Sequence, residues 1–169
     1  RAMTPVAKYW LCKRLPAVAT EAMECIGGSG YVEEHPLARL YREAPLNGIW
    51  EGSGNVVCLD LLRSFAKNPQ ITGLLLEEIR SGGPRLAPAV DALSRSLADA
   101  SNAEAGARRI VEQLALALQA SLMLRHADGA AAEAFCASRV DAGLRGPATL
   151  GTLPANVDFN ALIARTALK

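Results

Sequence analysis

The sequence predicts an all-α protein, a helical bundle without a sheet. Apolar residues recur every three to four positions along most of the 169 residues, which is the period of an α-helix. The other apolar stretches are rich in alanine, the strongest helix former. No segment alternates apolar and polar residues as a half-buried strand does. With 50% hydrophobic residues, we expect the chain to bury a substantial core.

The first predicted helix spans residues 5–26. Its apolar residues follow helical spacing and are Leu11, Leu15, Val18, Ala22 and Ile26. Pro16 lies inside this pattern, where it removes one backbone donor and crowds the preceding turn, so we expect a kink there. Gly27, Gly28 and Gly30 end the helix, because glycine turns freely into left-handed conformations.

The later helices follow from the same period. A short helix is predicted from Pro36 to about Glu43, and a loop covers residues 45–52. The next helix starts near Ser53, with a packing face formed by Val57, Leu61, Leu62 and Phe65. Beyond Pro69 the alanine and arginine content rises and aromatic residues nearly vanish. Further helices are predicted over residues 70–80, 84–101, 103–127, 129–143 and 158–167.

The composition argues against several classes of function. The net charge of +1 gives no global attraction to nucleic acid or to an anionic membrane. The four cysteines include no Cys-x-x-Cys pair, and only two histidines accompany them, so we expect reduced, buried thiols and no metal site. The longest apolar run, residues 114–124, is too short to span a membrane. We expect no signal peptide and a cytoplasmic protein.

Residues 24–63 contain the densest group of unusual features. Residues 26–31, Ile-Gly-Gly-Ser-Gly-Tyr, form a glycine-rich helix end, and such an end exposes amides to a phosphate. The same pattern also fits an ordinary helix end followed by a turn. No strand precedes the glycines, which excludes a Rossmann phosphate loop.

Glu51 is the candidate for a general base. It lies between Trp50 and the segment Gly-Ser-Gly, beside an apolar wall of the kind that favours such a base. The alternative is a carboxylate at a helix N-terminus, which the helix macrodipole favours. Arg63 would line the same cavity if it turned inward. Otherwise it is a solvated arginine that pairs with Asp60.

Three segments together resemble the C-terminal signature of the acyl-CoA dehydrogenases. They are residues 24–31 (Glu-Cys-Ile-Gly-Gly-Ser-Gly-Tyr), 40–44 (Leu-Tyr-Arg-Glu-Ala) and 49–55 (Ile-Trp-Glu-Gly-Ser-Gly-Asn). That family carries a Gln-x-x-Gly-Gly-x-Gly-(Phe/Tyr) segment, an Arg-Asp pair in a short helix and an Ile-Tyr-Glu-Gly-Thr-x-x-Ile-Gln loop. The order is the same and the spacing is close, which is not expected by chance.

The departures from this pattern resemble the AidB-like branch of the family, named for a bacterial response to DNA alkylation. They are Glu24 for Gln, Trp50 for Tyr, Ser53 for Thr and Asn55 for Gln, and residues 8–14 and 41–45 also resemble that branch. The branch carries an extra helical extension. The resemblance therefore implies that residues 1–67 end the C-terminal helical domain and that residues 70–169 form an AidB-like helical extension.

The resemblance implies an oxidoreductase with FAD as cofactor and an acyl-CoA thioester as substrate. Glu51 would remove the α-proton while the β-hydride passes to the flavin, and the protein would orient the cofactor that carries the redox chemistry. Trp50 and Arg63 are candidates for lining the substrate cavity. These residues do not specify the length of the acyl chain.

The resemblance also implies contacts to FAD. Gly27 and Gly28 would lie near the adenosine or pyrophosphate part, which a neighbouring subunit mainly holds. Ser53 and Asn55 would contact FAD around the loop that follows the base. Glu24 departs from the usual amide: a carboxylate cannot donate the hydrogen bonds of an amide and repels pyrophosphate. One family contact is therefore not expected in this chain.

Two functions fit these features. The first is the enzyme just described. The second is a flavin-bearing, DNA-associated protein of the alkylation response with little or no dehydrogenase activity, in which the arginines of the extension bind DNA phosphates. The extension also fits a module used only for assembly. We expect the chain to be part of a longer protein, inactive by itself, that forms a homo-oligomer, a tetramer at full length, without membrane association.

Overall fold

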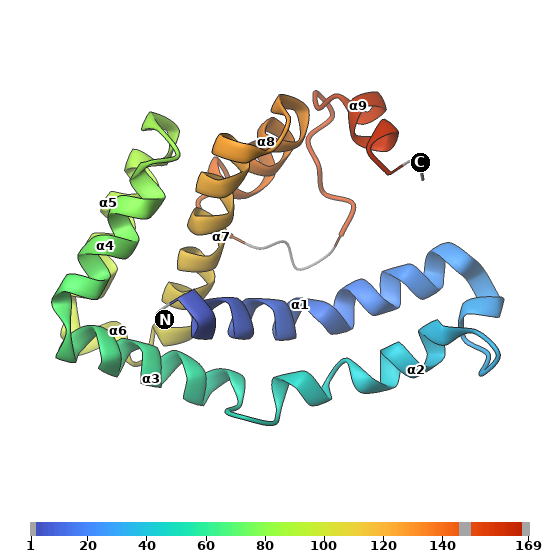
Figure 1. Ribbon diagram of the computed structural model, residues 1–169, viewed down its shortest axis with the longest axis horizontal. Helices are drawn as coiled ribbons and strands as arrows, with labels where there is room; N and C mark the ends of the chain where they lie inside the picture. Colours follow the sequence, from blue (N-terminus) through green and yellow to red (C-terminus); the bar gives the residue numbers. More distant parts are fainter. Residues whose placement is uncertain (1–2, 146–149, 167–169) are drawn as a thin grey trace.

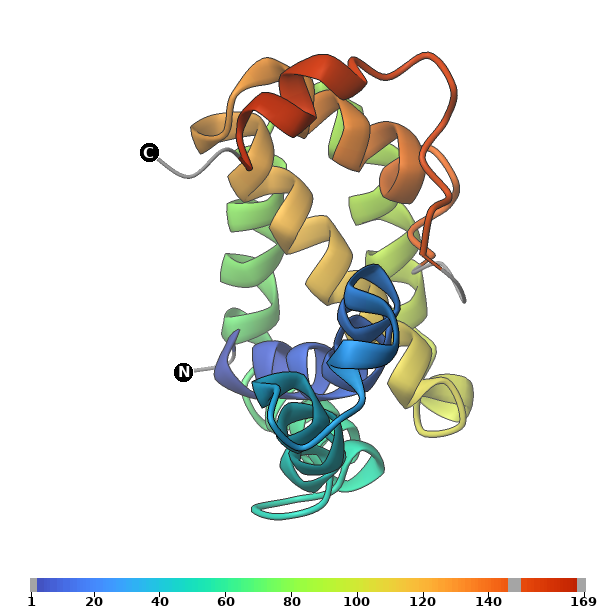
Figure 2. The ribbon, with the colours of Figure 1, turned by 90° about the vertical axis from the view of Figure 1, so that its right-hand side faces the viewer.

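The computed structural model describes residues 3–145 and 150–166, without the side chains of residues 100 and 101. Within these residues, helices are joined by turns and no strand occurs, which confirms the predicted all-α class. The helices form two groups that meet at one end of the molecule (Figure 1). In a view turned by 90°, the N-terminal helices lie at the bottom and most of the extension rises above them (Figure 2).

The first group contains the N-terminal helices, and the second contains the extension. The first comprises α1 (Met3–Ile26), η1 (Gly27–Gly30), α2 (Pro36–Glu43), η2 (Leu46–Gly48) and α3 (Gly54–Lys67). The second comprises α4 (Pro69–Arg80), η3 (Pro84–Leu86), α5 (Ala87–Ala98), α6 (Ala100–Ala103), α7 (Ala107–His126), α8 (Gly129–Phe135), the π-helical η4 (Cys136–Val140) and α9 (Phe159–Ala164).

Helix α7 is the centre of the fold and contacts helices of both groups. Its buried apolar side chains include Ile110, Val111, Leu114 and Leu116. One continuous core joins them to Val6 and Tyr9 of α1 and to Val57, Cys58 and Leu61 of α3. The predicted boundary at residues 67–70 is therefore not a break in packing. The division into two domains stays a prediction.

Helix α1 continues through Pro16, and its ribbon changes direction near the middle without a break (Figure 1). The hydroxyl of Thr20 donates to the carbonyl of Pro16 at 2.9 Å. The apolar stripe expected to make α1 amphipathic is not its buried face, since Leu11 and Leu15 are 61% and 39% exposed. The helix packs instead through another face, which carries Val6, Tyr9 and Ala19. Hydrophobic spacing identified the helix but not the face that packs.

Four predicted helices in the extension differ from the observed ones. The helix predicted over residues 84–101 ends at Ala98, because Asp99 leaves the helical conformation with ψ 79°. The helix predicted from residue 103 starts only at Ala107, after a turn that ends at Gly106. The helix predicted over residues 129–143 widens into a π-helix at Cys136. The last observed helix spans residues 159–164, and residue 167 of its predicted range lies outside the described residues.

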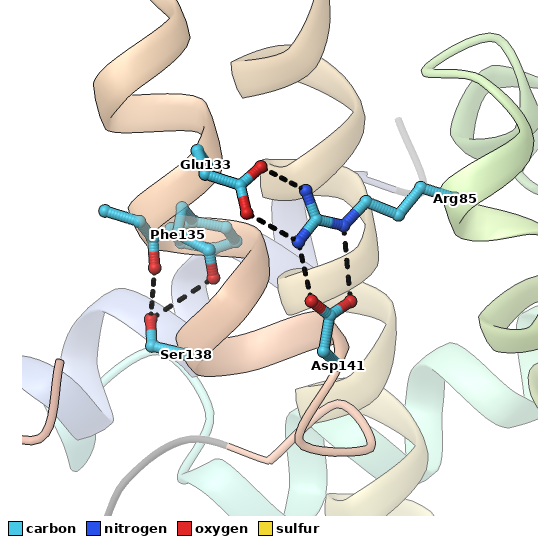
Figure 3. A network of polar contacts seen from close by, with 6 residues as sticks. Arg85, Glu133, Phe135, Ser138 and Asp141 are labelled. Carbon is cyan, nitrogen blue, oxygen red and sulfur yellow. Dashed lines mark hydrogen bonds and ion pairs between the residues drawn. The ribbon is translucent and has the colours of Figure 1, made fainter. Parts of the chain in front are cut away.

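Arg85 joins segments of the extension that lie about fifty positions apart in the sequence (Figure 3). Arg85, in η3, donates from Nη1 to Oε2 of Glu133 at 2.5 Å and from Nη2 to Oδ2 of Asp141 at 2.6 Å. These hydrogen bonds hold the pKa of each carboxyl group below its ordinary value and raise the pKa of the guanidinium. The pair of bonds links η3 to α8 and to the turn after η4.

The cysteines are free thiols in different environments. Cys58 and Cys136 are buried, as predicted, whereas Cys12 is half-buried and Cys25 is exposed. The expectation of buried thiols is therefore wrong for Cys25, which lies in the last turn of α1 away from the core. None of the described helices is long and apolar enough to cross a membrane.

Candidate functional site

The candidate base lies on a short loop between η2 and α3, residues 49–53, called here the Glu51 loop. The amides of Ile49 and Trp50 donate to the carbonyl of Leu46 at 2.9 and 3.2 Å, which starts the turn. Glu51 then adopts a left-handed conformation with φ 53°, and Gly52 follows with φ 99°. A residue with a Cβ atom rarely adopts this conformation, so the backbone at Glu51 is strained.

Lys8 of α1 binds the backbone of this loop. Its ammonium group donates to the carbonyl oxygens of Trp50 at 2.6 Å, Glu51 at 3.2 Å and Gly52 at 2.7 Å. Lys8 is not among the site residues that the sequence predicts. The one signal that points to it is its spacing, because residues 8, 11, 15 and 18 share one face of a helix and Lys8 is the charged residue on that apolar stripe.

A groove of about 590 Å³ runs between α1 and the Glu51 loop, called here the α1 groove. Its lining residues are Lys8, Leu11, Cys12, Arg14, Leu15, Val18, Asn47, Trp50 and Glu51. The exposed apolar stripe of α1 thus forms one wall, and Trp50 and Glu51 border it. This volume lies in the usual range for sites of small molecules and cofactors.

The Glu51 side chain is exposed to solvent in this chain, and Trp50 is 55% exposed. The apolar wall predicted beside the base is therefore present but open on one side. Glu51 precedes the N-cap of α3, Ser53, by two residues, so it does not belong to the first turn of that helix. The two interpretations of its carboxylate, a general base and a charge at the helix N-terminus, both stay predictions.

Arg63 is not part of the α1 groove. Its guanidinium pairs with the carboxylate of Asp60 at 2.9 Å on the surface of α3. It lines a separate, mainly apolar groove of about 540 Å³ that is bordered by α3, α4 and α5. The structure therefore does not bring Arg63 and Glu51 together, and it agrees with the alternative of an arginine paired with Asp60.

The predicted FAD residues occupy two places. Gly27 and Gly28 follow the last residue of α1, and Gly27 has φ 74°. A Cβ atom added to either glycine would have no other group within 4 Å. They do not border the α1 groove. Ser53 and Asn55 start α3 with exposed side chains, and Ser53 makes no capping hydrogen bond through its hydroxyl. The two glycines thus fit an ordinary helix end followed by a turn, and the space beside them is open.

Several arginines of the extension are engaged within the chain. Arg85, Arg125 and Arg165 form ion pairs with Glu133 and Asp141, with Glu78, and with Asp128. The Nε of Arg108 donates to the hydroxyl of Tyr9 at 3.3 Å. The ion pairs weaken the positive field that a DNA-binding surface would need, whereas the hydrogen bond to Tyr9 leaves the charge of Arg108 in place. Among residues 3–145 and 150–166, no group of His, Cys, Asp and Glu is arranged to hold a metal ion.

Comparison with known proteins places these residues in a family. Residues 1–66 match the family model of the acyl-CoA dehydrogenase C-terminal domain. AidB of Escherichia coli is 42% identical over 144 residues, which cover 83% of this chain and 26% of AidB. The chain belongs to the acyl-CoA dehydrogenase family. Because the match to AidB reaches far into the extension, the predicted resemblance to the AidB-like branch of the acyl-CoA dehydrogenases is confirmed.

Further similarity to the acyl-CoA dehydrogenases is found in Caenorhabditis elegans. Acyl-CoA dehydrogenase family member 11 is 42% identical over 71 residues, or 42% of this chain and 12% of that protein. The crystal structure of ACDH-11 in complex with C11-CoA aligns with a TM-score of 0.63 and 28% identity, over 78% of this chain and 26% of that chain. The chain thus spans about a quarter, or less, of the length of each of these matches.

Proposed function

We propose that this chain is the C-terminal part of an FAD-dependent, acyl-CoA dehydrogenase-like oxidoreductase and that Glu51 is its general base. The observation that carries the proposal is the position of Glu51, in the signature loop of the family and at the edge of the apolar α1 groove. The family membership of residues 1–66 supports the reaction type. A solved relative in complex with C11-CoA supports the class of substrate.

In this reaction the Glu51 carboxylate accepts the α-proton of the acyl-CoA thioester. FAD, when bound, supplies the group that takes the hydride from the β-carbon. The apolar side chains of Leu11, Leu15 and Trp50 would hold an acyl group and keep water from the carboxylate. Asn47 contributes a polar group to the same lining. Positioning of the base next to the carbon acid is the contribution of this chain.

The start of α3 fits an anionic part of FAD such as the pyrophosphate. The amide of Val57 is the first to bond within the helix, to the carbonyl of Ser53 at 3.0 Å. The amides of the preceding turn therefore point out of the helix N-terminus, where the macrodipole favours an anion. Ser53 and Asn55 add an exposed hydroxyl and amide, which are donors of the right kind. The open space beside Gly27 and Gly28 permits the close approach of a second part of FAD.

The exposed apolar stripe of α1 supports assembly of the full-length protein. Leu11, Leu15 and Val18 are 61%, 39% and 47% exposed, and they form a continuous surface with the groove. Exposed apolar patches of this kind mark contact sites, so another subunit or another part of a longer chain would cover the part of the stripe that no acyl group occupies. We propose a homo-oligomer, a tetramer at full length, located in the cytoplasm. DNA binding by the extension stays a prediction, and the paired arginines do not favour it.

The test is anaerobic reduction of the flavin in the full-length protein. Acyl-CoA thioesters of short to long chain length are mixed with the purified flavoprotein, and loss of flavin absorbance is followed. We expect bleaching with at least one thioester and none with free CoA or with a thioether analogue, whose α-protons are not acidic. Bound flavin that no thioester bleaches would favour the DNA-associated alternative over the enzyme.

A further inference from the structure

We propose that Lys8 is a positioning residue for Glu51. Its ammonium group holds three successive carbonyls of the Glu51 loop and so fixes the backbone from which the carboxylate reaches its substrate. The inference rests on the proposed function, because it assigns Lys8 a part in the action of Glu51. It adds a residue from α1, 43 positions before the base in the sequence, to the machinery of the site.

The geometry uses the full donor capacity of the lysine. An ammonium group has three N–H donors, and the three acceptors lie at 2.6, 3.2 and 2.7 Å from Nζ. Three successive carbonyls converge on one point only where the backbone curls. The curl here is made by the left-handed conformations of Glu51 and Gly52, with φ 53° and 99°. The cation and the curled loop are therefore complementary.

The strained conformation of Glu51 explains why a group from outside the loop, the ammonium of Lys8, is needed. Glycine adopts positive φ without strain, but a glycine at position 51 would have no carboxylate. A glutamate there is held in an unfavourable conformation, which persists only when surrounding contacts fix it. Hydrogen bonds from a charged donor are stronger than neutral ones, and Lys8 supplies them to the strained residue and to both of its neighbours.

The lysine itself is held by a rigid element. Val6 and Tyr9, on either side of it in α1, are buried in the core with 1% and 6% exposure. Gly52 lies against α3 on the other side, since a Cβ atom on it would be 3.1 Å from Cγ2 of Val57. The loop is thus held between α1 and α3, and Lys8 is its polar attachment to α1. The lysine touches the backbone of the loop and acts on the reaction through Glu51.

The test compares three variants of the full-length flavoprotein. Lys8→Met keeps the length of the side chain but has no donors. Lys8→Arg keeps the charge, yet its planar group donates in a different direction. Lys67→Met is the matched control, since Lys67 is an exposed lysine at the end of α3, outside the lining of the α1 groove. Two quantities are measured: the thioester-dependent rate of flavin bleaching, and hydrogen exchange of the amides in residues 46–57 by mass spectrometry.

For Lys8→Met we expect the bleaching rate at saturating thioester to fall by about 10- to 100-fold, the scale of a misplaced catalytic group, with a much smaller change in half-saturation. We expect faster exchange confined to residues 46–57. Lys8→Arg should recover part of the rate, and Lys67→Met should match wild type. An unchanged rate together with unchanged exchange in Lys8→Met would overturn the proposal. So would faster exchange throughout the protein, because Lys8 would then stabilise the fold in general.

Failure of the proposed function gives a different result. In that case wild type itself is not bleached by any thioester, and the rate carries no information about Lys8. The exchange measurement still decides whether Lys8 holds the loop. Faster exchange confined to residues 46–57 in Lys8→Met supports the attachment, and exchange equal to that of wild type refutes it.

Discussion

Gly82, in the turn after α4, lies directly against Ser121 of α7. A Cβ atom on Gly82 would be 2.6 Å from the Cα of Ser121 and 2.9 Å from its Oγ. Ser121 is fully buried, and its hydroxyl donates to the carbonyl of Glu78 at 2.9 Å. The close approach therefore needs a residue without a side chain, and it sets the distance between α4 and α7.

We expect Gly82→Ala to destabilise the chain by about 1–3 kcal/mol, because the methyl group displaces the backbone of α7. Gly73→Ala is the control, since Gly73 lies inside α4 and a Cβ atom added to it would have no other group within 4 Å. It should stabilise the helix by roughly 0.5–1 kcal/mol. Urea denaturation measures both. Equal effects of the two substitutions would contradict the contact.

The contacts of Arg85 predict a dependence of stability on pH. The hydrogen bonds from Arg85 lower the pKa of Glu133 from 4.5 and that of Asp141 from 3.8. A lowered carboxyl pKa gives stability that is present above the ordinary value and is lost as the pH falls through the lowered one. Arg85→Met should therefore lower the Tm at pH 7, and its difference from wild type should shrink as the pH falls below about 4.

Arg39→Met serves as the control for that series. Arg39 and Glu43 form an exposed pair at 3.9 Å, with side chains 71% and 60% exposed. Its loss should change the Tm little at any pH, as is usual for surface ion pairs. Thermal unfolding followed by circular dichroism between pH 3 and about pH 7 gives both curves. A pH-independent effect of Arg85→Met would show that its packing, and not its charge, stabilises the extension.

The cysteines should differ in reactivity. Burial raises the pKa of the Cys58 thiol to about 11, against the weaker opposing effects of Arg108 and Lys13. The thiolate is the reactive form, and Cys58 is also inaccessible, with 0% exposure. At a pH of about 8, maleimide should label the exposed Cys25 within minutes and leave Cys58 unmodified until the chain unfolds. Mass spectrometry of the peptides checks this. Labelling of both thiols at one rate would contradict the burial of α3 against α7.

The apolar stripe of α1 should cause this chain to self-associate when it is produced alone. Leu11 and Leu15 are large, exposed and adjacent to the α1 groove. Changing both to Gln should reduce association in sedimentation velocity experiments. Leu74→Gln is the comparison, because Leu74 is 67% exposed on α4, outside the lining of the α1 groove, and should have little effect. A wild-type chain that stays monomeric at high concentration would contradict this expectation.

Local signals in the sequence predicted much of the fold. Pro36 and Glu43 bound the observed α2, Gly27 turns left-handed after α1, and Ser53 is the N-cap of α3. Each depends on the residue itself or on its near neighbours, which is why a single sequence carries it. The glycine and Glu51 motifs were found because they match a family in order and spacing.

Relations between distant residues were not predictable in the same way. The bond from Lys8 to the Glu51 loop joins residues more than forty positions apart, and the helical spacing of Lys8 does not show which group it binds. The orientation of Arg63 depends on a surface pair with Asp60. The spacing of Leu11 and Leu15 predicts an apolar face, but it does not specify whether this chain or another covers that face. Each of these depends on tertiary packing.

The most direct test of the account is the rate of anaerobic flavin bleaching by acyl-CoA in the full-length protein with Glu51→Gln. Glutamine keeps the size and polarity of glutamate but cannot accept the α-proton. We expect the variant to bind flavin and thioester nearly as wild type does and to bleach at least about 100-fold more slowly, the scale of lost general-base catalysis. Trp50→Phe should slow the reaction far less. If the Glu51→Gln protein bleaches at the rate of wild type, Glu51 is not the base.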